Sequence, residues 1–358
     1  MFKISLSYSF SEQRSHALLS SELIDTLSAI ESQGSIAAAA KFLGISYRHL
    51  WGRIKRWEET LGHPLVHGSR GRDTRLTDLA QKMLWAERQV IARNEMELVK
   101  VRTDLERVFA LAMASDAQIV TLSGCPDESL ITLRDTLAAQ NVILDINFNS
   151  SRKGLEDLAA ERSLIAGFNA PMWATAQSNA GATFSEFFAS SEVSLFRYCA
   201  RTQGLAVAKG NPLGLCSLID VVRKDARFIN RERGTGTRVL LEDLLTHSGL
   251  SARQLRGYDH EEASHLAVAQ AVAQGSADAG LCIESAAKKA GIDFIPFIVE
   301  NYYLAVLRKN LSHPGLPQLL ETLRSETWRE QIRTLPGYVA DNAGQPVSHT
   351  EVAWLDAK

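Results

Sequence analysis

The sequence lacks any long apolar segment. Hydrophobic residues make up 45% of its 358 positions, yet none of its stretches approaches the roughly 18 consecutive apolar residues of a membrane-spanning helix. The opening, MFKISLSYSFSEQRSH, also lacks the apolar core that a secretory signal needs. We therefore expect a cytoplasmic protein that neither spans nor binds a membrane.

Cysteines and catalytic motifs are also scarce. The four cysteines are Cys125, Cys199, Cys216 and Cys282. They lack metal-type spacing, and each lies in or beside an apolar run, which favours buried, reduced thiols. The sequence holds no HExxH, CxxC, P-loop or nucleophile elbow. We expect no catalysis, no metal and no cofactor, with one alternative left open, in which Cys125 pairs in space with His260 or His265 to act on a small anion.

Net charge is low but unevenly distributed. The formal charge is −2 at pH 7, whereas residues 41–75 hold far more basic than acidic side chains. The basic residues of this segment are Lys41, Arg48, Arg53, Lys55, Arg56, Arg70, Arg72 and Arg75. A local surplus of positive charge is typical of a surface that binds a polyanion.

Three helices are predicted after an extension, residues 1–19, in which we expect little fixed structure. Apolar residues repeat at helical spacing in residues 20–33, and Ser35 and Ser46 are placed to cap two further helices. The last of these, which ends near Leu61, has one apolar and one basic face. This order predicts a helix-turn-helix domain, residues 20–76, whose last helix enters the major groove of DNA.

A β-hairpin wing with a basic tip is predicted in HPLVHGSRGRDTRLTD. The alternative is a solvated charge run on an ordinary helix bundle. The candidate DNA-contacting residues are Ser35, Ser46, Tyr47, Arg48, His49, Trp51, Arg53, Lys55, Arg70 and Arg72.

A long helix is predicted for residues 77–114, where Gly and Pro are absent. Its length would be about 50 Å at 1.5 Å per residue. An apolar stripe recurs at alternating spacings of three and four, at Leu98, Val101, Leu105, Val108 and Ala112. Pairing with the same helix of a second copy would give a homodimer that reads a palindromic site, and packing on its own domain is the alternative.

Short β-type runs alternate with helical segments in residues 115–358, which predicts an α/β domain with ligand loops at strand ends. Successive strands near residues 193–209 and 292–307 are natural crossovers between two lobes. We expect one lobe of about 116–200 plus 295–358, a second of about 201–294, and a cleft between them.

The segment FINRERGTGTRVLLEDLL is the strongest candidate for a ligand loop. It predicts a strand, a glycine-punctuated turn and a helix, so that backbone N–H groups, hydroxyls and Arg231 face one point. Such a helix start suits an anion. The alternative is an ordinary turn whose threonine caps the helix.

Loops after three other predicted strands should complete the cleft, because hydroxyl, amide and backbone donors together surround an oxyanion without a metal. Serines after strands are equally common as helix caps. The candidate ligand-binding residues are Ser123, Gly124, Cys125, Asn149, Ser150, Ser151, Asn169, Arg231, Gly234, Thr235, Gly236 and Thr237.

Two resemblances extend these predictions. GSIAAAAKFLGISYRHLWGRIKRWEETLGHPLV and the later RLTD resemble the winged helix-turn-helix of LysR-type and ModE-type bacterial regulators over roughly residues 20–110, and SYRHLW is closer to the ModE variant. The resemblance implies a homodimeric or larger regulator of double-stranded operator DNA.

The second resemblance covers most of residues 116–310. GLAVAKGNPLG, FINRERGTGTRVLLEDLL, GYDHEEASHLAVAQAVAQGSADAGLCIESAA and DFIPF resemble the periplasmic-binding-protein-like domain fused to such regulators and to molybdenum-cofactor enzymes. RERGTGT is similar to the loop of molybdate-type and tungstate-type solute-binding proteins. This implies an oxyanion effector held by Arg231, Thr235 and Thr237, with formate, another small anion or a cofactor precursor as the alternative.

Overall fold

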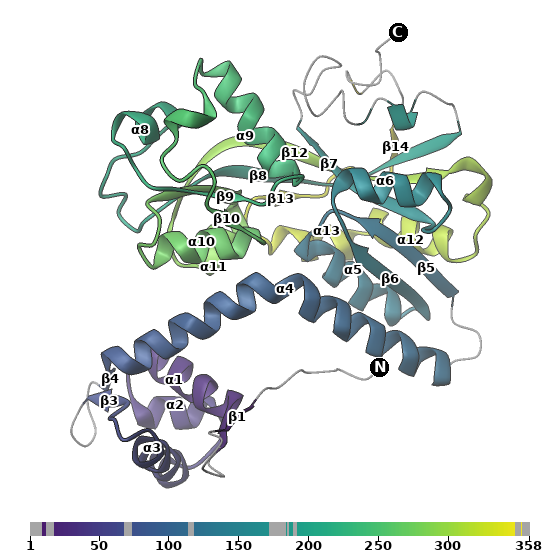
Figure 1. The fold of residues 1–358 in the computed structure, drawn as a ribbon. Helices are drawn as coiled ribbons and strands as arrows, with labels where there is room; N and C mark the ends of the chain where they lie inside the picture. The colour runs from purple at the N-terminus through teal and green to yellow at the C-terminus, as the bar shows by residue number, and fades with distance from the viewer. Residues whose placement is uncertain are drawn as a thin grey trace. The chain divides into compact units, whose positions relative to one another are not determined.

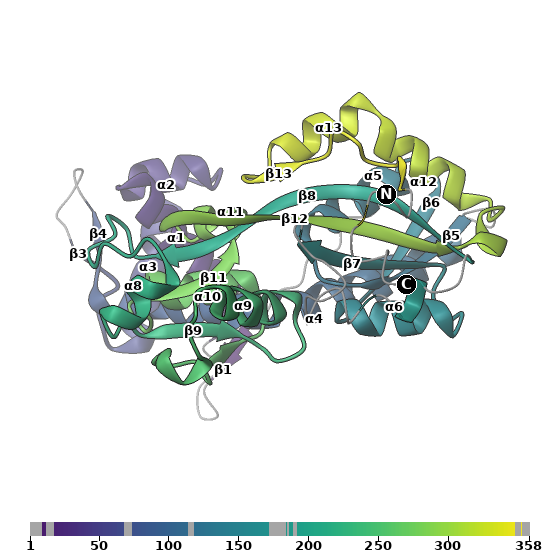
Figure 2. The same cartoon turned by 90° about the horizontal axis from the view of Figure 1, so that it is seen from above.

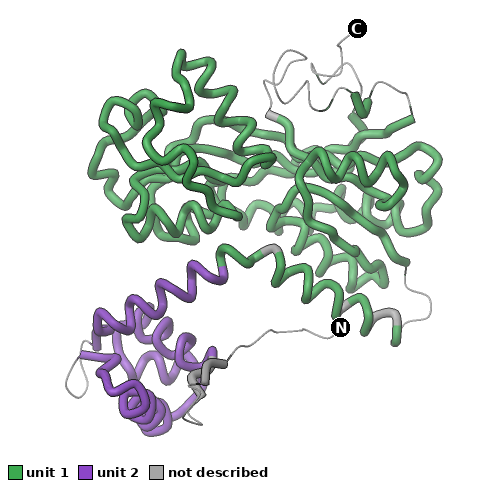
Figure 3. The backbone as a smooth tube through the Cα atoms, viewed as in Figure 1, with its two compact units in different colours: residues 1–4, 92–358 green, residues 5–91 purple. Residues whose placement is uncertain are grey.

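The computed structural model describes residues 9–11, 18–67, 74–113, 118–171, 184, 186–188, 192–347 and 352. The chain divides into an N-terminal unit, residues 5–91, and a C-terminal unit that contains residues 92–358 (Figure 3). One helix, α4 (Asp78–Met113), begins in the first unit and ends in the second. Within the described part of the chain, no helix is long and apolar enough to cross a membrane.

The N-terminal unit is a small helical domain (Figure 1). Its elements are β1 (Ser9–Ser11), β2 (Leu18–Ser20), α1 (Ser21–Gln33), α2 (Ile36–Phe42), α3 (Tyr47–Leu61), β3 (Val66–His67) and β4 (Arg75–Leu76). The Ser35 hydroxyl accepts the Ala38 N–H at 3.2 Å, and Ser46 caps α3 in the same way. The predicted helices and their caps are therefore confirmed. The predicted wing tip, with Arg70 and Arg72, lies outside the described residues.

The core of this unit forms where the apolar stripes of its helices meet. Leu27 and Ile30 of α1 pack with Leu50 and Ile54 of α3, and all four side chains are fully buried. Burial of apolar area is the main stabilising term in such a small domain. The opposite face of α3 is left for solvent or a partner.

Among its described residues, the C-terminal unit is built on a sheet of ten strands whose main order is β10-β9-β11-β8-β12-β7-β5-β6. Its strands are β5 (Gln118–Gly124), β6 (Val142–Phe148), β7 (Ile165–Pro171), β8 (Val193–Val207), β9 (Phe228–Arg231), β10 (Glu261–Glu262), β11 (Ala279–Ile283), β12 (Asp293–Leu307), β13 (Tyr338–Val339) and β14 (Pro346–Val347). Strands β8 and β12 pair along their whole length and join two groups of strands (Figure 2).

These two long strands correct the prediction of successive shorter strands near residues 193–209 and 292–307. Each region is one continuous strand of 15 residues. Polar residues interrupt the apolar pattern at the centre, but Arg201 and Glu300 pair with each other across the strands instead of forming a turn. Register shifts at Pro296/Ile298 and Tyr302/Tyr303 bend β12 without ending it.

Helices cover the sheet in both groups. They are α5 (Glu128–Ala138), α6 (Ser151–Ala159), α8 (Leu218–Arg223), α9 (Gly236–His247), α10 (His265–Ala273), α11 (Glu284–Lys289), α12 (Gly315–Arg324) and α13 (Glu326–Arg333). We call the group around β5, β6 and β7 the first lobe and the group around β9, β10 and β11 the second lobe. The predicted fold class, a helix-turn-helix followed by a two-lobed α/β domain, is confirmed.

The second half of α4 is bonded to its own unit by polar side chains. Arg93 contacts the carboxylate of Glu262 at 2.6 and 2.9 Å, and Thr103 accepts from Arg134 at 2.9 Å. Its apolar residues Val101, Leu105 and Val108 are 45%, 39% and 64% exposed. The helix therefore packs on its own domain through one face and leaves an apolar stripe outside.

Candidate functional site

The junction of the two lobes holds a buried ion cluster. Arg201 on β8 donates to Glu300 at 2.5 Å and to Asp127 at 2.6 Å, and the Tyr338 hydroxyl donates to Asp127 at 3.1 Å. Burial alone would lower the pKa of Arg201, but Glu300 and Asp127 raise it well above its usual value. The charge of this arginine is therefore already matched inside the protein.

Arg231, at the end of β9, is in a different position. It is only 5% exposed, and its Nη1 donates to the Glu262 carbonyl at 3.1 Å, while its Nε has no hydrogen-bond partner. No carboxylate lies within ion-pairing distance of it among the described residues. Burial lowers the pKa of Arg231 to about 10, so the side chain stays charged at neutral pH. A buried, unmatched cation is costly, and an anion beside it would recover that cost.

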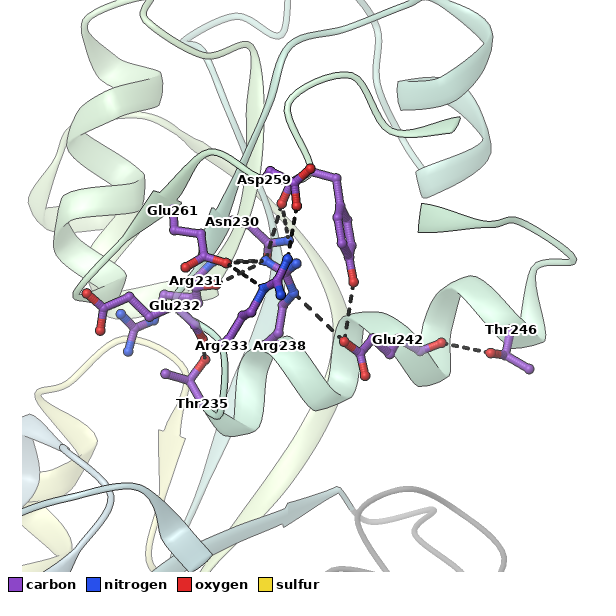
Figure 4. A network of polar contacts seen from close by, with 11 residues as sticks. Asn230, Arg231, Glu232, Arg233, Thr235, Arg238, Glu242, Thr246, Asp259 and Glu261 are labelled. Carbon is purple, nitrogen blue, oxygen red and sulfur yellow. Dashed lines mark hydrogen bonds and ion pairs between the residues drawn. The ribbon is translucent and has the colours of Figure 1, made fainter. Parts of the chain in front are cut away.

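The other two arginines of the loop are matched by neighbours (Figure 4). Arg233 lies 3.3 Å from Asp259 and 3.6 Å from Glu261. Arg238 lies 3.2 Å from Glu261, and its guanidinium stacks 3.9 Å from the centroid of the Tyr258 ring. Of the three arginines of the predicted anion loop, Arg231 is thus the one whose charge is not paired with a carboxylate among the described residues.

Three more of the predicted residues gather near Arg231. The Cys125 thiol lies beside Ser151 and Asn169 and within the electrostatic range of Arg231. Asn169 is 4% exposed, and neither end of its amide has a hydrogen-bond partner. Burial raises the pKa of Cys125, so its thiol is protonated and neutral. The structure therefore brings together a guanidinium whose Nε lacks a partner, a buried amide and two neutral groups.

Arg231 also lines a cavity of about 50 Å³ whose wall comes from both lobes. Asp127 and Ile131 come from the first lobe, and Arg231 and His265 come from the second. The His265 Nδ1 is buried without a partner. Burial, with Arg231 and Arg201, lowers the pKa of His265 well below its usual value, so the ring is neutral.

Several central residues were missed by the sequence analysis. They are Arg201, Gln203 and Glu300 of the long strands, together with His265 as part of the cavity wall. A signal was present, because Arg201, Thr202 and Gln203 interrupt an otherwise apolar strand. Gln203 is 1% exposed, and both ends of its amide lack a partner.

Other predicted ligand residues form hydrogen bonds away from Arg231. The Ser123 hydroxyl donates to Asp157 at 2.8 Å and accepts from Asn149 at 2.9 Å, and all three line a second cavity of about 450 Å³. Gly124 has a structural role, since an added Cβ would meet the Gly167 oxygen at 2.1 Å.

Three further predicted residues, Ser150, Thr235 and Gly234, stabilise the backbone of their own loops. Ser150 accepts the Lys153 N–H as the cap of α6, and the Thr235 hydroxyl donates to the Glu232 carbonyl at 2.8 Å. Gly234 has a φ of +85°, which favours glycine. The remaining two, Gly236 and the buried Thr237, form the start of α9, where backbone N–H groups lack helical acceptors.

The thiol–imidazole alternative finds no support in this arrangement. His260 is exposed, whereas His265 and Cys125 are both held in neutral forms by burial. A reactive thiolate needs a lowered pKa, and that of Cys125 is raised. The expectation that all cysteines are buried holds for Cys199 and Cys282, whereas Cys125 is half-buried and Cys216, just before α8, is exposed.

The exposed face of α3 forms the candidate nucleic-acid surface. The Tyr47 and Trp51 rings are nearly parallel with centroids 6.3 Å apart, and the Lys55 Nζ lies 4.7 Å from the Trp51 centroid. Arg48 and His49 are exposed beside them. Arg53 departs from this surface, since it forms an ion pair with Glu22 and covers the Trp57 ring. Predicted residues Ser35 and Ser46 are helix caps.

A helix-turn-helix unit is joined to a two-lobed α/β domain with a polar inter-lobe cavity. Comparison with known families agrees with this architecture. Residues 21–81 match the bacterial regulatory helix-turn-helix protein, lysR family, and residues 134–324 match the PBP superfamily domain. The second match covers more than half of the chain, so the chain belongs to the PBP superfamily. The first match places a lysR-type helix-turn-helix at residues 21–81, ahead of the PBP superfamily domain.

Curated relatives resemble parts of the chain. The uncharacterized protein YvgK of Bacillus subtilis (strain 168) is 38% identical over 156 residues, which are 44% of this chain and 50% of YvgK. An uncharacterized protein from the 5' region of a ferredoxin 2Fe-2S gene in Clostridium pasteurianum is 31% identical over 111 residues, 31% of this chain and 98% of its own length. The chain thus spans half the length of YvgK.

Solved structures show a more distant likeness. Full-length BenM has a TM-score of 0.43 at 16% identity, over 85% of this chain and 95% of BenM. The LysR family transcriptional regulator CbnR has a TM-score of 0.41 at 18% identity, over 84% of this chain and 98% of CbnR. Scores at this level carry no functional argument.

Proposed function

We propose that this regulator senses a small oxyanion that binds at Arg231, and that molybdate or tungstate is the effector. The single observation that carries the proposal is a buried guanidinium with a free Nε and no carboxylate partner among the described residues. A bound anion would supply the missing charge and acceptor. Formate, another small anion or a cofactor precursor is the alternative effector.

The groups around Arg231 support a polyatomic anion with several acceptor atoms. The Asn169 amide offers a donor, and the start of α9, with Gly236 and Thr237, offers backbone N–H groups. Cys125 and Ser151 are neutral neighbours that do not repel an anion. We place these residues in the proposed site. Because Ser123 and Asn149 bond to Asp157, we assign them no direct contact with the effector.

The first prediction is selective stabilisation by an oxyanion. At a concentration of 100 times Kd, a ligand stabilises the folded state by about 2.7 kcal/mol, which corresponds to a rise in Tm of about 5–10 °C for a domain of this size. We expect this rise with molybdate or tungstate, and a smaller one with formate, sulfate, phosphate or chloride. Differential scanning fluorimetry of the full chain measures it, and an absence of any anion-dependent rise would reject the sensing proposal.

The N-terminal unit is proposed to read the operator through the exposed face of α3. In a recognition helix, side chains near the N-terminus lie at base edges. Tyr47 and Trp51 present flat apolar surfaces suited to thymine methyl groups, and Arg48 offers donors for guanine or phosphate. Because a regulator needs access to the chromosome, we place this function in the cytoplasm.

The second prediction concerns Tyr47→Ala. Loss of one base contact costs about 1–3 kcal/mol of discrimination, so specific affinity should fall about 5- to 160-fold while affinity for random DNA stays within about twofold. Fluorescence anisotropy with an operator selected from random duplexes measures both values. Thr60→Ala, at the other end of α3, is the matched control. An equal loss on specific and random DNA would show that Tyr47 does not read bases.

A second copy of the chain is the proposed partner of α4. Regulators of this family bind operator DNA and are oligomeric. The exposed stripe of Val101, Leu105 and Val108 has the spacing that pairs helices. Sedimentation equilibrium of the wild type and of Val108→Glu tests this assignment, since a charge in the stripe should shift a dimer toward monomer.

A further inference from the structure

The inter-lobe cavity is closed on one side by α4, which contributes Glu95 to its wall. Arg231, His265 and Ser285 also line it, and each carries a buried polar atom without a hydrogen-bond partner: Nε, Nδ1 and Oγ, respectively. Buried polar atoms left unpaired cost free energy. Glu95 therefore belongs to the wall of a cavity that already needs polar partners.

The charges around this cavity leave two of opposite sign unmatched. Asp127 is bonded to Arg201, and Glu128 forms an ion pair with Lys289. Among the described residues, neither Glu95 nor Arg231 has an ion-pair partner within 4.0 Å, and both line the same cavity. Burial raises the pKa of Glu95, and Lys289 and Arg231 act against that rise. Glu95 is thus the acidic residue that α4 contributes to the wall of the cavity that Arg231 also lines.

Helix α4 is tied to both lobes on either side of Glu95. Toward its start, the Ser264 hydroxyl donates to the Ala92 carbonyl at 2.7 Å, and Arg93 binds Glu262 of the second lobe. Toward its end, Arg107 lies 2.9 Å from Asp145 of the first lobe. The Glu262 residue is also the register partner of Arg231. Arg231 is therefore linked to α4 through Glu262, which Arg231 contacts at the backbone and Arg93 contacts at the carboxylate.

We infer that Glu95 competes with the effector anion for Arg231, so that anion binding weakens the hold of the C-terminal unit on α4. The inference rests on the proposed oxyanion site. Arg231 and Glu95 line the same cavity, and a second negative charge in this low-dielectric place repels the first. Because α4 continues into the N-terminal unit, its release is a direct link between effector and DNA-binding surface.

Coupling of this kind is reciprocal. If the anion weakens the interaction of Glu95 with Arg231, then removal of the Glu95 charge must strengthen anion binding by the same factor. Glu95→Gln keeps the size of the side chain and removes the charge. Glu97→Gln, two residues along the same helix at an exposed position, is the matched control. Glu95→Ala is a second variant that makes the same change by truncation.

The experiment uses the full chain and tungstate as the probe. Isothermal titration calorimetry should give a Kd about 10-fold lower for both Glu95 variants than for the wild type, and a Kd within about twofold for Glu97→Gln. The rate of amide hydrogen exchange in α4 is a second measurement, because it would not respond to tungstate if Glu95 had only a structural role. Saturating tungstate should speed exchange in α4 residues 92–103 of the wild type, and should leave exchange in Glu95→Gln unchanged.

The outcomes separate this inference from the proposed function. Wild-type binding with the same Kd in both Glu95 variants would overturn the competition while leaving the oxyanion site intact. Tungstate binding to none of the proteins would overturn both. Tighter binding by the Glu95 variants with no exchange difference in wild-type α4 would overturn the proposed link to the helix.

Discussion

Arg201→Met is expected to destabilise the protein by about 3–5 kcal/mol, because it leaves the carboxylates of Asp127 and Glu300 buried without a cation. Both side chains are almost completely buried, at 0% and 2% exposure. The three residues join the two long strands to the start of α5, so the loss falls on the junction of the lobes. The free energy of unfolding in urea measures this effect.

A control distinguishes the loss of a charge partner from a packing defect. The triple variant Asp127→Asn, Arg201→Met and Glu300→Gln removes all three charges together, and buried ion clusters replaced as a whole by neutral groups are often tolerated. We expect it to recover most of the stability lost by the single variant. If the triple variant were as unstable as Arg201→Met, the cost would come from packing and not from unpaired carboxylates.

Arg231→Met is expected to weaken oxyanion binding at least about 30-fold. Removal of one partner from a buried charged contact costs about 2–5 kcal/mol, and each 1.4 kcal/mol is about tenfold in affinity. The anion-free protein should not lose stability, because the change removes an unmatched buried charge. Calorimetric titration with tungstate and melting curves without anion measure the two effects.

Arg233→Met is the matched control for this prediction. Its side chain belongs to the same loop but is 76% exposed and is matched by Asp259 and Glu261. The Kd of this variant for tungstate should remain within about threefold of the wild-type value. Equal weakening by both substitutions would indicate a general effect of positive charge on the loop, and would remove Arg231 from its assigned place.

Local features of the fold were predictable from the sequence because they depend on neighbouring residues. Ser35 and Ser46 mark helix starts through hydroxyls that accept N–H groups three residues later. The period of the apolar residues in α3 identified its buried face. Arg231 was predicted in the same way, since the loop after β9 combines glycine, threonine and arginine in a short strand-turn-helix segment.

The remaining parts of the site depend on contacts between distant segments. Arg201 and Glu300 are 99 residues apart in the chain, and only the register of β8 and β12 makes them partners. Glu95 reaches the cavity because α4 packs on both lobes. Conversely, Ser123 was expected in the cleft, but its hydroxyl bonds to Asp157 on α6. The sequence places a side chain at a strand end without showing which cavity it enters.

The central claim is that an oxyanion binds between the lobes at Arg231. The most direct test is a crystal structure of the full chain with tungstate, in which the anomalous scattering of tungsten locates the ion. The account predicts one strong peak beside the Arg231 guanidinium, with tungstate oxygens in hydrogen-bonding reach of its Nε and of Asn169. A peak in the cavity of Ser123 and Asp157, or no peak at a tungstate concentration that saturates the protein in solution, would contradict it.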